Sequence, residues 1–156
     1  MIRFSIPGFR VLRLERLVLD YNGTLAVDGK LVGGVAPRLR RLSAQLEIHV
    51  VTADTFGRAR EALAGLPCKV QVLPKSGQDA AKLAYVRRLG ARGCACIGNG
   101  RNDRLMLRAA ALGIAVVLAE GASTETVAAA RVVTTSITDA LDLLIRPLRL
   151  VATLRS

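Results

Sequence analysis

A short apolar run that ends in an acid is the feature of this sequence that most restricts its fold. Leu17-Val18-Leu19 is followed directly by Asp20, and the turn-prone pair Asn22-Gly23 comes two residues later. A buried parallel strand delivers a carboxylate in this way to the carboxyl edge of an open α/β sheet, where such folds carry their sites. A strand end with a solvated acid would be the simpler interpretation if the run stood alone, so the downstream sequence decides between the two.

Downstream, strand-like apolar runs alternate with segments of helical periodicity. We expect strands at 14–20, 47–53, 68–73, 94–97, 113–118 and 132–134, and helices at 37–46, 78–89, 123–130 and 137–145. In the helix at 78–89 the apolar spacing predicts that Leu83, Val86 and Leu89 face inward. Asp54 or Thr55 is expected to cap a further helix that carries Ala59, and Asn102 or Asp103 to begin another. Alternation of this kind predicts right-handed crossovers over a parallel sheet. The fold class is therefore α/β, a three-layer Rossmann-like sheet with helices on both faces.

Two hairpins and a tail complete the expected domain. Residues 1–13 alternate apolar and polar side chains around Pro7-Gly8, which predicts an N-terminal hairpin. Asp28-Gly29 between short apolar pairs predicts a small flap over 26–32, beside Asp20. Residues 147–156 are expected as a basic tail. At 156 residues the chain is expected to form a single domain without a large cap.

Composition excludes some partners. Hydrophobic residues make up 51% of the chain, but no apolar run reaches the roughly 20 residues of a membrane span, and the start does not resemble a signal peptide. We therefore expect a cytoplasmic protein with no membrane partner. The net charge of +11 comes mostly from scattered arginines, and aromatics are 3%. Nucleic acid is not the expected partner, because the stacking residues of single-strand binders are scarce.

The cysteines are expected to be ordinary core thiols. Cys94 and Cys96 lie two residues apart on one predicted strand and so share a face, while Cys68 lies elsewhere. An odd number of cysteines in such a chain does not indicate a disulfide framework.

Four segments occur in an order that resembles a known family. They are Asp20-x-x-Gly23-Thr24-Leu25, Thr52 at a strand end, Lys82 on a helix, and the loop 98–103, Gly-Asn-Gly-Arg-Asn-Asp. This order resembles the haloacid dehalogenase (HAD) superfamily of phosphohydrolases, and most closely the phosphorylation domain of P-type ATPases. The resemblance extends from about Leu14 to Leu144. Only residues 21–51 separate Asp20 from Thr52, which leaves no room for the nucleotide-binding domain of those ATPases, so ion pumping is not expected.

The resemblance implies a role for each matched residue. Asp20 would be the nucleophile that forms an aspartyl-phosphate, and Lys82 would neutralise the phosphoryl group, with Lys75 as the alternative lysine. The implied catalytic set is Asp20, Asn22, Thr52 and Lys82, and the implied phosphate-binding set is Gly23, Thr52, Ala53 and Lys82. The implied Mg²⁺ ligands are Asp20, Asn22, Asn99 and Asp103.

Two positions depart from the family pattern. Asn22 stands where the family's phosphatases carry an acid/base Asp, and Asn99 stands where the metal loop has an acid. An amide cannot shuttle a proton, which removes a contribution of about 10²–10⁴ in rate. A neutral ligand also weakens the binding of a hard cation. We therefore expect a slow Mg²⁺-dependent phosphatase or phosphotransferase, and the alternative is a catalytically retired pseudo-phosphatase that serves as a binding or regulatory module.

The expected partner is a phosphorylated substrate, either a small molecule or a macromolecule. A homo-oligomer is also expected, because a capless chain of this size would struggle to cover its apolar excess, and the flap 26–32 could contribute to assembly.

Overall fold

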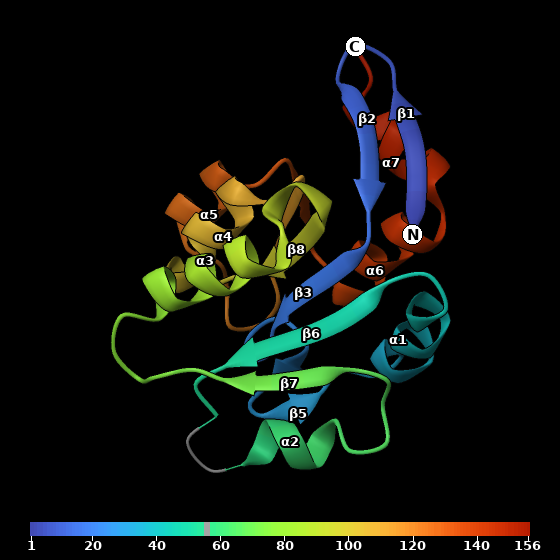
Figure 1. The fold of residues 1–156 in the computed structure, drawn as a ribbon. Helices are drawn as coiled ribbons and strands as arrows, with labels where there is room; N and C mark the ends of the chain where they lie inside the picture. Colours follow the sequence, from blue (N-terminus) through green and yellow to red (C-terminus); the bar gives the residue numbers. More distant parts are fainter. Residues whose placement is uncertain (55–56) are drawn as a thin grey trace.

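A parallel six-stranded sheet forms the centre of the protein in a computed structural model that describes residues 1–54 and 57–156. Its strands are β3 (Arg16–Asp20), β6 (Glu47–Thr52), β7 (Lys69–Val72), β8 (Cys94–Gly98), β9 (Leu112–Val116) and β10 (Val132–Thr134). The spatial order is β10-β9-β8-β3-β6-β7, with every neighbouring pair parallel. Figure 1 labels β8, β3, β6 and β7 of this sheet. From β3 the chain runs outward through β6 to β7, then crosses back to β8 on the other side of β3 and runs outward through β9 to β10. The strand order therefore reverses beside β3, and such switch points are where α/β folds bind ligands.

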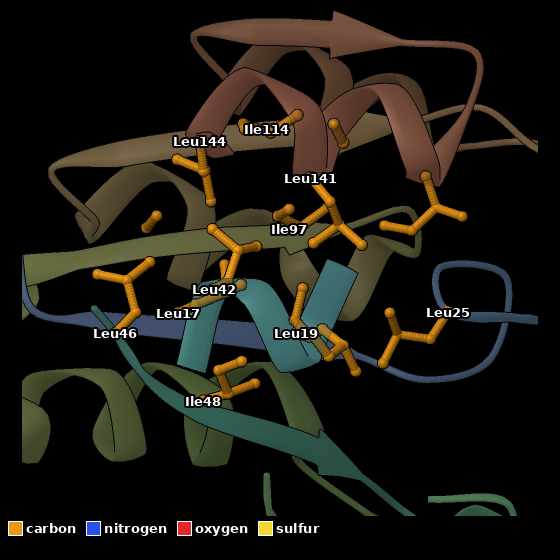
Figure 2. Close-up of a cluster of buried hydrophobic side chains, with 14 of the residues drawn as sticks. Leu17, Leu19, Leu25, Leu42, Leu46, Ile48, Ile97, Ile114, Leu141 and Leu144 are labelled. Carbon is orange, nitrogen blue, oxygen red and sulfur yellow. The ribbon is translucent and has the colours of Figure 1, made fainter. Parts of the chain in front are cut away.

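Helices cover both faces of this sheet, which confirms the predicted three-layer α/β architecture. On one face α1 (Val35–Ser43) packs against α6 (Ile137–Ile145), and on the other α3 (Gln78–Leu89) and α5 (Thr124–Ala129) flank α4 (Arg104–Ala109). Successive side chains of a strand point to opposite faces. Leu17 and Leu19 accordingly lie in the core beneath α1 and α6 (Figure 2), whereas Val18 packs in the second core.

The two predicted hairpins are both present. β1 (Ile2–Ile6) pairs antiparallel with β2 (Arg10–Leu14), and β4 (Ala26–Val27) pairs antiparallel with β5 (Lys30–Leu31). In the flap turn, Asp28 has φ 51° and Gly29 has φ 77°, which is the left-handed conformation that an Asp-Gly hairpin requires. The Tyr21 hydroxyl donates a hydrogen bond to the Gly29 carbonyl at 3.0 Å and ties this flap to the turn after Asp20.

The expected basic tail is wrong, because residues 147–154 fold as a helix. Helix α7 (Pro147–Leu154) begins with a proline, whose fixed φ suits the first helical turn. Leu150 is fully buried, and Val151 and Leu154 also pack against the main core, where α7 contacts β1. The apolar side chains on one side of the segment bind it beneath the N-terminal hairpin, while its arginines face solvent.

The inward face of α3 also differs from the prediction. The helical pattern predicted Leu83, Val86 and Leu89 inward, but the structure buries Lys82, Tyr85 and Val86 and leaves Leu83 half-buried. Lys82 lies on this buried face of α3, and its ammonium reaches Asp20 at the carboxyl edge of the sheet.

One smaller finding concerns the start of α2 (Arg58–Ala62). The predicted cap Thr55 lies outside the described residues, while Asp54 accepts a hydrogen bond from the Arg60 backbone at 3.3 Å.

No helix among the described residues is long and apolar enough to cross a membrane.

Candidate active site

The carboxyl ends of three central strands meet at Asp20. In the register of β3 with β6, Asp20 pairs with Val51, so Thr52 lies one residue further along the same edge. On the other side of β3, Leu19 pairs with Ile97, which brings Gly98 and the loop behind it to this edge. The sheet therefore brings Asp20, Thr52 and the loop 98–103 to one place, as the strand pattern predicted.

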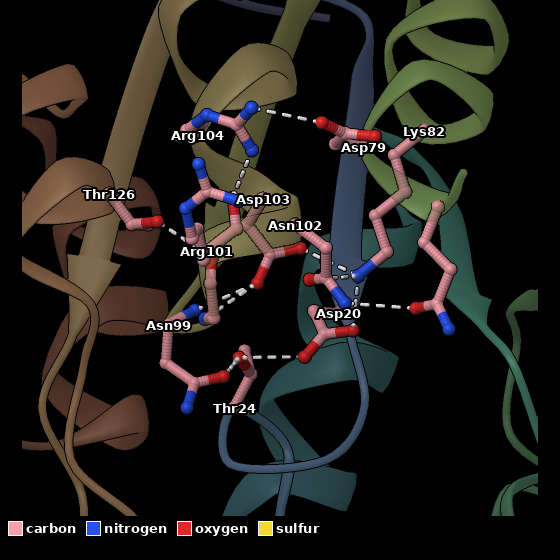
Figure 3. A network of polar contacts seen from close by, with 12 residues as sticks. Asp20, Thr24, Asp79, Lys82, Asn99, Arg101, Asn102, Asp103, Arg104 and Thr126 are labelled. Carbon is pink, nitrogen blue, oxygen red and sulfur yellow. Dashed lines mark hydrogen bonds and ion pairs between the residues drawn. The ribbon is translucent and has the colours of Figure 1, made fainter. Parts of the chain in front are cut away.

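A buried lysine connects the two acids of this site (Figure 3). The Lys82 ammonium donates to Asp20 Oδ1 at 2.7 Å and to Asp103 Oδ1 at 2.6 Å, and its side chain is only 1% exposed. Burial alone would lower the pKa of Lys82, but the carboxylates of Asp20 and Asp103 outweigh it and raise the pKa above its ordinary value. Lys82 is thus held as a cation between two carboxyl groups.

Asp103 is fixed by the backbone of its own loop. Its Oδ2 accepts hydrogen bonds from the Asn99 and Gly100 backbone N–H groups at 3.0 and 2.9 Å. A side chain at Gly98 would exclude this arrangement, since a Cβ there would lie 2.5 Å from Asp103 Cγ. Burial and the nearby Asp20 carboxylate raise the pKa of Asp103 to about 7, against the opposing effect of Lys82.

A threonine hydroxyl bridges Asp20 and Asn99. Thr24 Oγ1 lies 3.4 Å from Asp20 Oδ2 and 3.1 Å from Asn99 Oδ1, so its single proton is directed at both oxygens. The Asn99 amide also donates to the Gly121 carbonyl at 3.0 Å. Gly23 permits this approach, because it has φ 74° and a Cβ there would lie 2.3 Å from Asn99 Nδ2.

The turn after Asp20 separates Asn22 from this network. The Tyr21 carbonyl accepts hydrogen bonds from the backbone N–H groups of Thr24, Leu25 and Ala26. This tight turn leaves the Asn22 side chain exposed at the surface while Gly23 and Thr24 are buried. Asn22 therefore borders the site from the solvent side.

The remaining predicted residues are placed as follows. Thr52 is 2% exposed at the end of β6, and Ala53 follows it, half-buried. Lys75 is exposed in the loop before α3, so the structure brings Lys82 and not Lys75 to Asp20.

Three residues that contact the site were not assigned to it from the sequence, namely Thr24, Asn102 and Gln78. Asn102 Oδ1 accepts from Lys82 at 3.2 Å, and its amide donates to Gln78 Oε1 at 2.8 Å. Thr24 and Asn102 both belong to the matched motifs, which was the available signal for them. Gln78 carries no such signal, because only the packing of α3 against the loop places it there.

The oxygen atoms at this edge fit a weakly held divalent cation. Asp20 Oδ2 and Asn99 Oδ1 face the same Thr24 hydroxyl, whereas both oxygens of Asp103 are engaged by Lys82 and by backbone N–H groups. Over residues 1–54 and 57–156 no cluster of three or more His, Cys, Asp or Glu side chains is suited to a metal. Mg²⁺ commonly keeps several waters and takes one or two carboxylates. Asp20 and Asn99 are therefore the side chains that would hold it.

This chain has the fold of HAD superfamily hydrolases. It superposes on the 3-deoxy-D-manno-octulosonate 8-phosphate phosphatase of Moraxella catarrhalis, a complex with magnesium, phosphate and KDO, with a TM-score of 0.68 and 17% identity over 85% of this chain and 86% of that one. For the cobalt-bound phosphatase YrbI of Haemophilus influenzae the TM-score is 0.71 and the identity is 17%, over 86% of this chain and 88% of that one. For a Legionella pneumophila structure described as a HAD superfamily (subfamily III A) hydrolase the TM-score is 0.72 and the identity is 16%, over 90% of this chain and 86% of that one.

Closer sequence relatives come from Methanocaldococcus jannaschii. Uncharacterized protein MJ0073 is 51% identical over 59 residues, which span 38% of this chain and 63% of that relative, just under two thirds of its length. Uncharacterized protein MJ0072 is 49% identical over 39 residues, which span 25% of this chain and 89% of that relative. The chain therefore belongs to the same family as Uncharacterized protein MJ0072. No protein-family model matches the sequence, and the finer resemblance to P-type ATPase phosphorylation domains stays a prediction.

Proposed function

We propose that the protein is a phosphohydrolase that transfers a phosphoryl group from a phosphate ester to Asp20. The observation that carries the proposal is the buried Lys82 ammonium, 2.7 Å from Asp20 and 2.6 Å from Asp103 at the switch point of the sheet. A buried cation at this position places positive charge where a phosphate would approach. A purely structural ion pair gains little from such burial, because desolvation opposes it.

The chain's own residues support a two-step transfer. Asp20 Oδ1 is bound to Lys82, while Oδ2 has the longer 3.4 Å contact with Thr24. Attack of an Asp20 carboxylate oxygen on phosphorus forms the acyl phosphate and breaks the P–O bond to the leaving alcohol. A water molecule gives its proton to that alcohol and becomes hydroxide, because the neutral amide of Asn22 cannot act as an acid. A second water then attacks phosphorus and breaks the P–O bond to Asp20, its proton neutralises the hydroxide, and inorganic phosphate and the Asp20 carboxylate are released.

The phosphate oxygens would be bound by groups at the same edge. The Thr52 hydroxyl, the Ala53 backbone amide and the Lys82 ammonium are the donors that we assign to them. The Gly23 backbone N–H, which the resemblance also implied, donates to the Ala26 carbonyl at 2.8 Å instead. Mg²⁺, held by Asp20 and Asn99, would supply further positive charge against the phosphate oxygens when bound. With Asn99 as a neutral ligand, the affinity for the cation is expected to be low.

A phosphorylated small molecule is the first substrate class to test. Among the structures with this fold, the Moraxella catarrhalis phosphatase was solved with phosphate and KDO bound. The flap 26–32 is short, with strands of two residues each, which leaves room for larger phosphorylated substrates as well.

A binding module without turnover is the second candidate, and one observation favours it. Asn99 is already satisfied, since its oxygen accepts from Thr24 and its amide donates to Gly121. An acid at this position could not make the second of these bonds, so the neutral network stabilises the site without a cation.

Phosphatase assays with Mg²⁺ across a panel of phosphate esters test the proposal. Asp20→Asn should abolish turnover and the acid-stable phosphoenzyme that mass spectrometry would locate on the Asp20 peptide. Asp28→Asn is the matched control, because Asp28 is exposed in the flap and outside the site. Unchanged turnover in Asp20→Asn would exclude the aspartyl-phosphate route.

Asn22→Asp separates the enzyme from the binding module. Asn22 is exposed, so an acid at this position should cost little stability. It should raise turnover by about 10²-fold or more, because it supplies a proton donor. If Asn22→Asp combined with Asn99→Asp folds and binds Mg²⁺ but shows no turnover, the binding module becomes the better description.

A further inference from the structure

A cavity surrounded by arginines lies at the end of the sheet opposite Asp20. It has a volume of about 380 Å³, and its charged lining consists of Arg10, Arg13, Arg92, Arg108 and Arg131. Arg10 and Arg13 lie on β2, which leads into the start of β3, and Arg131 lies just before β10. These positions are at the amino ends of the strands, so the cavity is separate from the carboxyl edge that holds Asp20.

Backbone hydrogen bonds bring these separate segments together. Glu15, which follows β2, donates to the Gly93 carbonyl of the turn η1 (Ala91–Gly93) at 2.9 Å, and Ala111 donates to the Ala91 carbonyl at 3.0 Å. Arg131 donates from its backbone to the Gly113 carbonyl at 2.8 Å. The arginines are therefore carried on segments that are fixed to one another.

No acidic side chain neutralises this cluster. None of the side chains that line the cavity is acidic. The ion pairs that arginines form in the described part of the chain involve others, namely Arg16, Arg38, Arg101 and Arg104. Arg10 lies over the Phe9 ring, with its guanidinium carbon 4.6 Å from the centroid. Like charges gathered without counter-charges repel one another, and a bound anion would relieve that repulsion.

The positive charge extends beyond the first cavity. A neighbouring cavity of about 460 Å³ shares Arg13 and Arg92 and adds Arg16 and Arg87, although Glu15 also lines it. The first cavity, which has no acid, is consequently the stronger anion site of the two.

We propose that the 380 Å³ cavity binds a small anion that contains two or more linked phosphate groups. Guanidinium groups form paired hydrogen bonds with phosphate oxygens, and five of them exceed what one orthophosphate would need. The volume lies within the usual range of small-ligand pockets, roughly 300–1,000 Å³. The other lining residues are Val11, Leu12 and Ala109–111, with no aromatic ring to stack on a base. Recognition would thus rest on the phosphates.

Isothermal titration calorimetry with sodium tripolyphosphate tests this proposal. The titration is run in EDTA at fixed ionic strength, so that no divalent cation attracts the ligand to the Asp20 edge. We expect one site per chain and weaker binding as salt rises. Arg13→Ala/Arg92→Ala should lower the affinity at least tenfold, and Arg108→Ala/Arg131→Ala provides an independent pair should the first fold poorly.

The control pair is Arg40→Ala/Arg41→Ala, two exposed arginines on α1 that remove the same charge. If this pair lowers the affinity for tripolyphosphate as much as Arg13→Ala/Arg92→Ala does, the binding depends only on general surface charge and the proposal is overturned. A loss in Thr52→Ala as large as in Arg13→Ala/Arg92→Ala would place the ligand at the Asp20 edge and overturn it equally. Neither result bears on phosphatase activity, which the titration does not measure.

Two further ligands test the chemical class. Orthophosphate should bind at least tenfold more weakly than tripolyphosphate, and equal binding would contradict the requirement for linked phosphates. A single-stranded RNA oligonucleotide should not bind better than tripolyphosphate. If RNA binds through the same arginines while tripolyphosphate does not, the site is a nucleic-acid surface and the proposal fails.

Discussion

Lys82 is the residue on which the electrostatics of the site depend. Its ammonium stands between Asp20 and Asp103, and all three side chains are buried. A buried charge that loses its partner is costly, because neither water nor another group replaces the interaction. This residue consequently couples the stability of the fold to the chemistry of the site.

Lys82→Met should lower the free energy of unfolding by about 3–5 kcal/mol, since it leaves two buried carboxyl groups without their cation. Asp20→Asn combined with Lys82→Met should be less destabilised than Lys82→Met alone. Urea denaturation of the wild type and the two variants measures both effects. Wild-type stability in Lys82→Met would show that the two acids are neutral without the lysine.

Asn99→Asp should make stability depend on a divalent cation. The substitution removes the hydrogen bond from the Asn99 amide to the Gly121 carbonyl and leaves two oxygens facing each other, at a cost of about 1–3 kcal/mol. It also adds negative charge near Asp20. In EDTA the variant should therefore melt at a lower temperature than the wild type, and Mg²⁺ should restore more stability to the variant. If Mg²⁺ shifts both proteins equally, Asn99 does not face the cation.

His49 should make stability fall in mild acid. Its ring is buried on β6, with Nδ1 2.8 Å from the Tyr85 hydroxyl. Burial lowers its pKa below the ordinary 6.5, although Glu47 opposes this. The unfolded chain therefore binds a proton at His49 more readily than the folded chain does. The contribution of neutral His49 to the free energy of unfolding is fully present above about pH 6.5 and is lost as pH falls below that value.

The comparison between the wild type and His49→Gln isolates this contribution. Urea denaturation at pH 7.5 and 5.5 should show a larger loss of stability in the wild type than in the variant. Asp103, with a pKa of about 7, titrates in both proteins and cancels in the difference. Identical losses would mean that His49 is protonated equally in the folded and unfolded states.

At the scale of secondary structure, α7 is the element whose role changed most from expectation. It packs Leu150 beneath the N-terminal hairpin, while Leu148 on the same helix is 82% exposed. The helix therefore belongs to the folded unit rather than trailing from it.

Leu150→Ala should cost about 2–5 kcal/mol of unfolding free energy, the usual range for a buried leucine. Leu148→Ala on the same helix is the matched control and should change stability by less than about 0.5 kcal/mol. Thermal and urea denaturation of both variants give the comparison. Equal effects would mean that α7 does not dock on β1 in solution.

At the scale of the whole molecule, assembly is the remaining expectation. The large exposed apolar side chains of the described residues are Met1, Val11, Val117, Val133 and Leu148. They are carried on several separate segments, so they do not by themselves define a dimer surface.

The expected homo-oligomer stays a prediction, and light scattering across a range of protein concentrations tests it. A mass of twice 16.6 kDa or more would support it. Adding tripolyphosphate in the same experiment would show whether screening of the positive surface favours assembly. A monomeric mass at every concentration would remove the expectation.

Local patterns in the sequence were sufficient for the sheet, the two hairpins and the placement of Asp20 and Thr52 at one edge. The physical reason is that side-chain periodicity, turn chemistry and strand ends are properties of neighbouring residues. They were insufficient for α7, because its docking depends on the surface that β1 presents.

Only the tertiary structure decided between Lys82 and Lys75. Lys82 lies 62 residues from Asp20 in the chain, and the rotation of α3 on the sheet brings its ammonium within 2.7 Å of that acid. The Thr24 bridge from Asp20 to Asn99, and the meeting of five arginines at the opposite end, depend in the same way on how distant segments pack. The sequence determined which chemical groups reach each end of the sheet, and packing determined which of them touch.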